Sequence, residues 1–137
     1  LTKSMSTITQ TIMSAKTTTG QSAVTPLVEN FKTVVFTVTG AGSPTATIKF
    51  FTSDNELPPD STAAQSATNA WDYVQVIDLQ SGSGIAGDTG IAFTGSDDTR
   101  RFELNLNGAR WCGAVITAIS GGNVTILMRA FANASTT

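Results

Sequence analysis

The chain has 137 residues, the size of one domain, and can bury a core without a disulfide or metal. Its formal net charge is −2 and its eight Lys and Arg residues are scattered, which excludes the clustered basic face of a nucleic-acid-binding protein. Only 13% of the residues are charged, and Ser and Thr supply the polarity that is missing.

The first 20 residues favour either a flexible arm or an edge strand. Residues 8–15 hold β-branched side chains suited to a strand, whereas the polar run after them is typical of a flexible segment. The segment 22–29 contains Pro26, which cannot donate a hydrogen bond within a sheet, so we place it at a sheet edge. The last five residues, 133–137, are typical of a flexible tail.

Two pairs of strands are joined by glycine-rich turns. Residues 33–40 alternate Val and Phe with Thr, which is the period-two pattern of a half-buried strand. After a Gly-Ala-Gly-Ser-Pro turn, the segment 45–53 is again rich in β-forming residues. Residues 111–119 and 123–132 form a second pair around the turn 120–122. Each pair predicts a hairpin, because short glycine-rich turns join antiparallel neighbours.

A long loop and further strands lie between the two pairs. Residues 54–70 contain two consecutive prolines and few large apolar side chains, so we expect a loop, with a short helix near 63–67. The segment 71–79 alternates throughout and predicts one continuous strand. Shorter strands are expected around 90–94 and 100–107.

Together these segments predict an all-β fold of about eight or nine strands. Many short strands separated by turns favour a single β-sandwich or jelly-roll-like domain. We expect this domain to span residues 21–132, with flexible terminal arms on either side. No period of about 20–50 residues repeats, which argues against a solenoid or propeller.

The residue types needed for most catalytic and metal chemistry are missing. The chain has no His and a single Cys, Cys112, whose apolar surroundings predict a buried hydrophobe. A Ser-His-Asp triad, a Cys-His pair and ordinary zinc sites are thereby excluded. No phosphate-binding glycine motif is present. We expect no cofactor, and no membrane partner, because no stretch approaches the roughly 20 apolar residues of a spanning helix.

Carboxylate pairs are the remaining option for acid–base chemistry or calcium. Most acids lie in polar turns or on the solvent side of strands, where they are normally ionised and inert, so we do not expect an enzyme. Calcium prefers about six to eight oxygen ligands, and no recognisable loop motif supplies them. The pairs are Asp54 with Glu56, Asp97 with Asp98, and Asp72 with Asp78.

Two sets of residues are candidates for binding. Aromatic rings on a β surface can stack on glycans, which makes Trp71 and Trp111 candidates, although we expect both to fill the sandwich core. Long loops often carry binding residues. The candidates for partner contact in the long loop are Asp54, Asn55, Glu56, Pro58 and Pro59.

The span 31–132 resembles small structural proteins of bacteriophages, chiefly head decoration (cement) proteins and related neck or tail components. The segments that carry the resemblance are Val38-Thr39-Gly40-Ala41-Gly42, Phe51-Thr52-Ser53-Asp54-Asn55, Trp71-Asp72-Tyr73-Val74-Gln75-Val76, and the strand, Gly-Gly turn and strand from Ala114 to Ala130. The resemblance implies a non-enzymatic virion protein that decorates or stabilises the capsid. Its implied partners are a major capsid, neck or tail protein and further copies of itself, with a trimer as one closed arrangement.

Two other functions remain open from the sequence. A carbohydrate-binding or adhesin module would use loop residues and an exposed tryptophan. A hydrolase would need two carboxylates that converge in a cleft, with the pKa of one of them raised.

Overall fold

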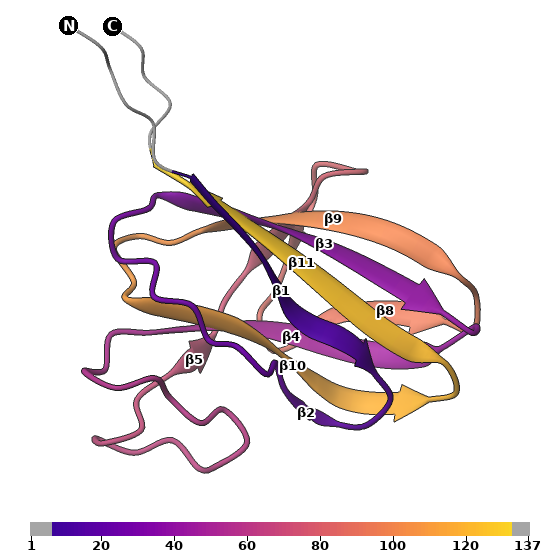
Figure 1. Ribbon diagram of the computed structural model, residues 1–137, viewed down its shortest axis with the longest axis horizontal. Coiled ribbons are helices and arrows are strands. Elements are labelled where there is room, and N and C mark those ends of the chain that lie inside the picture. Colours follow the sequence, from indigo (N-terminus) through magenta and orange to yellow (C-terminus); the bar gives the residue numbers. More distant parts are fainter. Residues whose placement is uncertain (1–6, 133–137) are drawn as a thin grey trace, which may run out of the picture.

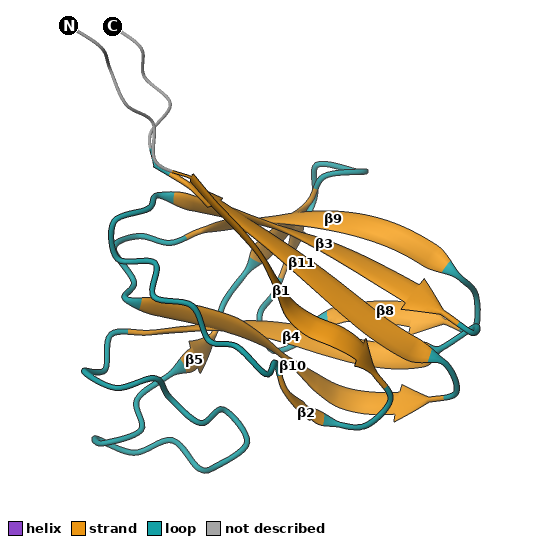
Figure 2. Cartoon of the chain, viewed as in Figure 1, coloured by secondary structure: helices purple, strands orange, loops and turns teal. Residues whose placement is uncertain are grey.

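The computed structural model describes residues 7–132, which form a β-sandwich without helices (Figures 1 and 2). This confirms the predicted all-β sandwich. Residues 7–132 contain eleven strands rather than eight or nine, because several have only two to four residues. The strands are β1 (Thr7–Lys16), β2 (Gly20–Gln21), β3 (Thr33–Ala41), β4 (Thr45–Ser53), β5 (Asp72–Tyr73), β6 (Val76–Asp78), β7 (Gly84–Ile85), β8 (Ile91–Thr94), β9 (Asp98–Asn105), β10 (Trp111–Ser120) and β11 (Asn123–Phe131).

The strands form two antiparallel sheets, which appear as two layers in Figure 1. Sheet A has six strands in the order β1-β11-β3-β9-β6-β7. Sheet B has five strands, in the order β2-β10-β4-β5, and β8 also pairs with β4. The alternation of side chains along each strand gives each sheet one inner face, toward the other sheet, and one outer face.

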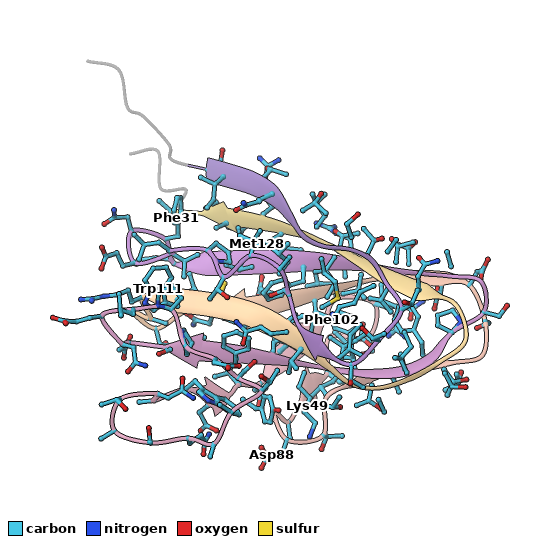
Figure 3. The ribbon with its side chains drawn as sticks, turned by 60° about the horizontal axis from the view of Figure 1, so that its bottom comes forward. Phe31, Lys49, Asp88, Phe102, Trp111 and Met128 are labelled. Carbon is cyan, nitrogen blue, oxygen red and sulfur yellow. The ribbon has the colours of Figure 1, made fainter. Side chains whose placement is uncertain are left out.

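The core lies between the sheets and is rich in Phe, Ile and Val. Phe36 of sheet A stacks on Phe50 of sheet B, with 4.5 Å between ring centroids. The ring of Phe102 on β9, labelled in Figure 3, has its centroid 6.1 Å from that of Phe50. Cys112 is fully buried on the inner face of β10, as predicted, and burial raises the pKa of its thiol to about 12. A thiol in this environment is an inert apolar group at neutral pH.

The two predicted hairpins are wrong, because their glycine turns carry the chain from one sheet to the other. β3 and β4 lie in different sheets, and so do β10 and β11. β3 pairs instead with β11, and β4 pairs with β10, so the two turns lie side by side at one end of the sandwich. A Cβ on Gly122 would lie 2.4 Å from the carbonyl oxygen of Ala41, which shows how closely the turns pack. Short glycine turns suit a sheet-to-sheet connection as well as a hairpin, and the alternation is the same in both cases.

The segment 71–79 is two short strands rather than one. β5 belongs to sheet B and β6 to sheet A, so the chain changes sheets at Val74 and Gln75. The helix expected near 63–67 is also wrong, since this part of the chain is a series of turns. Side chains of Asp60, Ser66 and Asn69 bond to the backbone there and so compete with helical hydrogen bonds.

The N-terminal segment is an edge strand over most of its length. β1 pairs with β11 at the edge of sheet A, so of the two predictions for the first 20 residues the edge strand holds for 7–16. Residues 1–6 and the predicted tail 133–137 lie outside the described residues. Pro26 lies at an edge as expected, where the amide of Val28 donates to the carbonyl of Arg110 at 2.7 Å.

Candidate functional site

The long loop between β4 and β5, residues 54–71, folds over the outer face of sheet B. Beneath it lie Phe51 and Val115, which are buried although they point away from the main core. A Cβ on Gly113 would come within 2.5 Å of the Phe51 ring, so the absence of a side chain there makes room for the ring. The loop therefore covers a second, smaller apolar cluster on the outside of the sandwich.

Gln21 of β2 fastens the loop to the sheet. Its Oε1 accepts hydrogen bonds from the amide and the hydroxyl of Ser61, at 2.6 and 2.7 Å, and its Nε2 donates to the carbonyl of Pro59 at 3.2 Å. Ser61 and Pro59 are buried by this contact. Because Gln21 pairs with Val115 in the sheet, the fastening lies directly beside the apolar cluster.

The side chain of Asn69 connects the two halves of the loop to each other, and that of Asp60 holds the turn at Thr62. Asn69 donates to the carbonyl oxygens of Asp60 and Ala64, and its Oδ1 accepts from the amide of Asp60. The carboxylate of Asp60 accepts hydrogen bonds from the hydroxyl and the amide of Thr62. These two bonds lower the pKa of Asp60, and the bond from the hydroxyl has the larger effect. The loop is thus held in one shape by polar contacts, in place of secondary structure.

Three of the five predicted contact residues take part in contacts that hold the loop. Asp54 accepts from the amide of Arg110 at 3.1 Å, and the carbonyl of Asn55 accepts from the indole of Trp111 at 2.8 Å. Pro59 is the third, buried against Gln21.

Glu56 and Pro58 are exposed, as a contact surface requires, and Leu57 between them has 75% of its surface exposed. Sequence reasoning missed Leu57, although it is the only large aliphatic residue in the polar segment 54–70.

Both tryptophans are half-buried, and neither belongs to the main core, contrary to our expectation. Trp71 packs edge-on between Phe51 and Tyr73, with ring centroids 6.4 and 5.0 Å away. Trp111, labelled in Figure 3, begins β10, where it pairs with Leu27. Its indole N–H donates a hydrogen bond to the carbonyl of Asn55. The indole group of Trp111 is therefore a structural anchor for the loop.

A groove lies beside the loop, at the end of the sandwich where the chain changes sheets. Its volume is about 730 Å³, and it is lined by Tyr73, Gln75 and residues at the end of β9. A smaller hollow of about 420 Å³ beside Trp71 shares Thr52 and Asp54 with it. Burial, and to a lesser extent the charge of Asp88, raise the pKa of Tyr73.

Members of the carboxylate pairs considered from the sequence form contacts within the protein. Asp78 is buried and forms an ion pair with Arg100, whereas Asp72 is exposed. Asp97 accepts a hydrogen bond from the amide of Ser43. Among residues 7–132, no three acidic or Cys side chains are grouped so that they could hold a metal ion. No helix in the same range is long and apolar enough to cross a membrane.

No protein-family model and no curated protein sequence matches the chain. Its fold is similar to that of the SPBc2 prophage-derived protein YomS, with a TM-score of 0.69 and 12% identity over 96% of this chain and 98% of that one. It is also similar to the PBSX exported protein XepA, with a TM-score of 0.72 and 11% identity; the match covers 96% of this chain and 40% of XepA. At these identities the likeness establishes the fold alone.

Proposed function

We propose that this protein is a non-enzymatic structural component of a phage virion that decorates or stabilises the particle through protein–protein contacts. The observation that carries the proposal is the similarity in fold to the prophage-derived YomS, which extends over nearly the whole of both chains. The sequence resemblance to phage decoration, neck and tail proteins favours the same role. It also favours a capsid, neck or tail protein as the partner.

The positions of the acidic residues support a non-enzymatic role. Asp54, Asp78 and Asp97 each accept a structural hydrogen bond or ion pair, which leaves fewer carboxylates for chemistry. The chain has no His to act as a general base. A protein with this inventory is better suited to binding than to proton transfer.

For the contact surface we propose the tip of the loop together with its neighbour on sheet B. Leu57 is 75% exposed and Leu27 is 48% exposed. Both are connected to Trp111, since Leu27 pairs with it in the sheet and Asn55, two residues before Leu57, accepts its indole N–H. An ion pair between Glu29 and Arg110 lies beside them, at 3.4 Å. Exposed apolar groups with a charged rim are the usual composition of a protein–protein interface.

Association with particles is the direct test of this function. Virions of the phage that encodes the chain would be purified on a density gradient, and their proteins identified by mass spectrometry. We expect the chain to band with intact particles and to remain bound after a second gradient. Its presence in the lysate, but not in the particle band, would overturn the virion role.

The partner and the oligomeric state need two further measurements. Tagged recombinant protein added to particles that lack it should co-sediment with heads or with tails, and cross-linking should identify the shell or tail protein that it contacts. Light scattering of the isolated protein should give a defined homo-oligomer, with a trimer as the closed ring we propose. A monomer at every concentration would remove self-association from the proposal.

A further inference from the structure

The groove at Tyr73 has a chemistry of its own, separate from the apolar surface at Leu57. It exists because the chain crosses from β5 to β6 at Val74 and Gln75, which separates the two sheets at this end of the sandwich. Four segments line it: the end of β4, residues 73–77 around the crossing, the end of β9, and the turn between β9 and β10. Its volume of about 730 Å³ falls within the range of small-molecule sites.

The floor of the groove is apolar and its walls are polar. Leu106 and Ala109 are buried, and Val74 packs against the main core. Around this floor stand Tyr73, three amides and two carboxylates, and no Lys or Arg side chain lines the groove. These polar lining residues are Tyr73, Gln75, Asn105, Asn107, Asp54 and Glu103.

This lining selects among classes of ligand. Two carboxylates without a basic partner repel phosphates and other anions. A purely apolar ligand would leave the amides and carboxylates without hydrogen bonds, which is costly. A metal ion would need a third acidic or sulfur ligand, and none is grouped with these carboxylates in the described residues. The class of ligand that remains compatible with this lining is a neutral molecule with many hydroxyl groups.

Sugars match each part of the lining. An amide side chain both donates and accepts hydrogen bonds, as does a sugar hydroxyl, while a carboxylate accepts from two neighbouring hydroxyls. The apolar face of a sugar ring can pack on an aliphatic side chain such as that of Val74. In residues 7–132, the side chains of Gln75 and Glu103 form no hydrogen bond or ion pair within the protein, so both can bind a ligand.

The groove is also held in shape before any ligand arrives. The ring of Tyr73 is packed by Trp71 at 5.0 Å, and the ammonium of Lys49 lies 4.9 Å from its centroid. Asn105 accepts from the amide of Asn107 at 3.3 Å. A Cβ on Gly87 would lie 2.6 Å from the backbone of Tyr73, so the loop before β8 packs tightly behind it. Such preorganisation lowers the entropy lost on binding.

We propose that the Tyr73 groove is a binding site for neutral oligosaccharides. This differs from the sequence-based hypothesis, which placed glycan stacking on Trp71 and Trp111. The site stands whether or not the protein is a virion component, so the two proposals can fail independently.

The test begins with an array of neutral oligosaccharides built from glucose, galactose, mannose and N-acetylglucosamine, with sialylated and sulfated glycans on the same array. We expect binding to neutral glycans only. The strongest of these would then be titrated by calorimetry. No binding to any neutral glycan, or binding to the acidic glycans alone, would overturn the proposal.

Variants then locate the site. Tyr73→Ala and Gln75→Ala should each weaken binding by about tenfold or more, whereas Tyr73→Phe, which keeps the ring, should lose less. Gln10→Ala on β1 is the matched control, because Gln10 is exposed at the opposite edge of sheet A from β6. Gln75 is itself exposed, so its variant should fold even if Tyr73→Ala does not. The assignment would be overturned if Gln75→Ala and Tyr73→Phe both bound the glycan with unchanged affinity and Tyr73→Ala, if it folds, also bound it normally.

Discussion

The outer faces of the two sheets are built from the same alternating pattern, but one is covered by a loop and the other faces solvent. On sheet B, the outward residues Phe51 and Val115 are buried under the loop 54–71. On sheet A, a row of directly opposed residues crosses four strands, namely Thr11, Leu127, Thr37 and Arg101. Three members of this row are exposed and Thr37 is half-buried.

The difference shows that composition decides which face needs a cover. Burying one Phe or Val side chain is worth about 1.5–3 kcal/mol, so outward apolar residues on sheet B favour docking of a segment over them. Threonine on sheet A is a good strand former and stays hydrated without a cover. The loop is therefore part of the fold of sheet B, although it has no secondary structure.

Removing the largest side chain under the loop should have the greatest effect. We expect Phe51→Ala to lower the free energy of unfolding by about 3–5 kcal/mol, because it leaves a cavity between the loop and Gly113. Val35, buried on the outer face of sheet A, is the comparison. Val35→Ala should cost about 1–2 kcal/mol, since it removes only two methyl groups. Urea unfolding followed by circular dichroism measures both, and equal losses would mean that the loop does not stabilise sheet B.

Gln21→Ala tests the fastening of the loop and should have the next largest effect. It leaves the buried Ser61 without its acceptor, at a cost of about 1–3 kcal/mol. Limited proteolysis should then cut within 54–71 faster than in the wild type. Gln10→Ala, which removes an exposed glutamine from the uncovered side, should change stability by less than about 0.5 kcal/mol. If the loop of Gln21→Ala were cut no faster than that of Gln10→Ala, the fastening would lie elsewhere.

Acid should loosen the loop but not the uncovered face. The pKa of Asp60 is lowered from its usual 3.8 by its bonds to Thr62, so its ionised form is favoured when the loop is folded. This contribution is present above pH 3.8 and is lost as the pH falls through the lower pKa of the folded state. The protection factor of the Thr62 amide, which is its intrinsic exchange rate divided by its observed rate at the same pH, should therefore fall in acid in the wild type and change less in Asp60→Asn. Identical pH profiles in the two proteins would contradict the role of this carboxylate.

Much of the fold could be predicted from local patterns, whereas the pairing of its strands could not. The alternation in 33–40 and the β-forming composition of 45–53 correctly indicated strands, and period two in the first of them reflects one buried face. It does not reveal which strand lies opposite, so a glycine turn between sheets was mistaken for a hairpin. The switch of sheets at Val74 was hidden for the same reason, since inner-facing residues continue to alternate across it.

The candidate site was predicted only in part. The polar composition of 54–70 correctly predicted a loop. It did not predict that Asp54 and Asn55 would form the hydrogen bonds that anchor this loop. That outcome depends on Arg110 and Trp111, which are more than 50 residues away in the sequence. The groove also depends on segments that are distant in the sequence, since Tyr73 and Asn107 come together only through the topology.

The smallest effect on stability is expected at the exposed leucines, and here the two faces should differ in binding instead. Leu57→Ser and Leu127→Ser remove side chains that are 75% and 39% exposed, so each should change the free energy of unfolding by less than about 1 kcal/mol. If the loop tip is the contact surface, Leu57→Ser alone should weaken co-sedimentation with phage particles. Loss of binding in Leu127→Ser, with Leu57→Ser unaffected, would move the contact to sheet A. The uncovered face would then be the one that the virion covers.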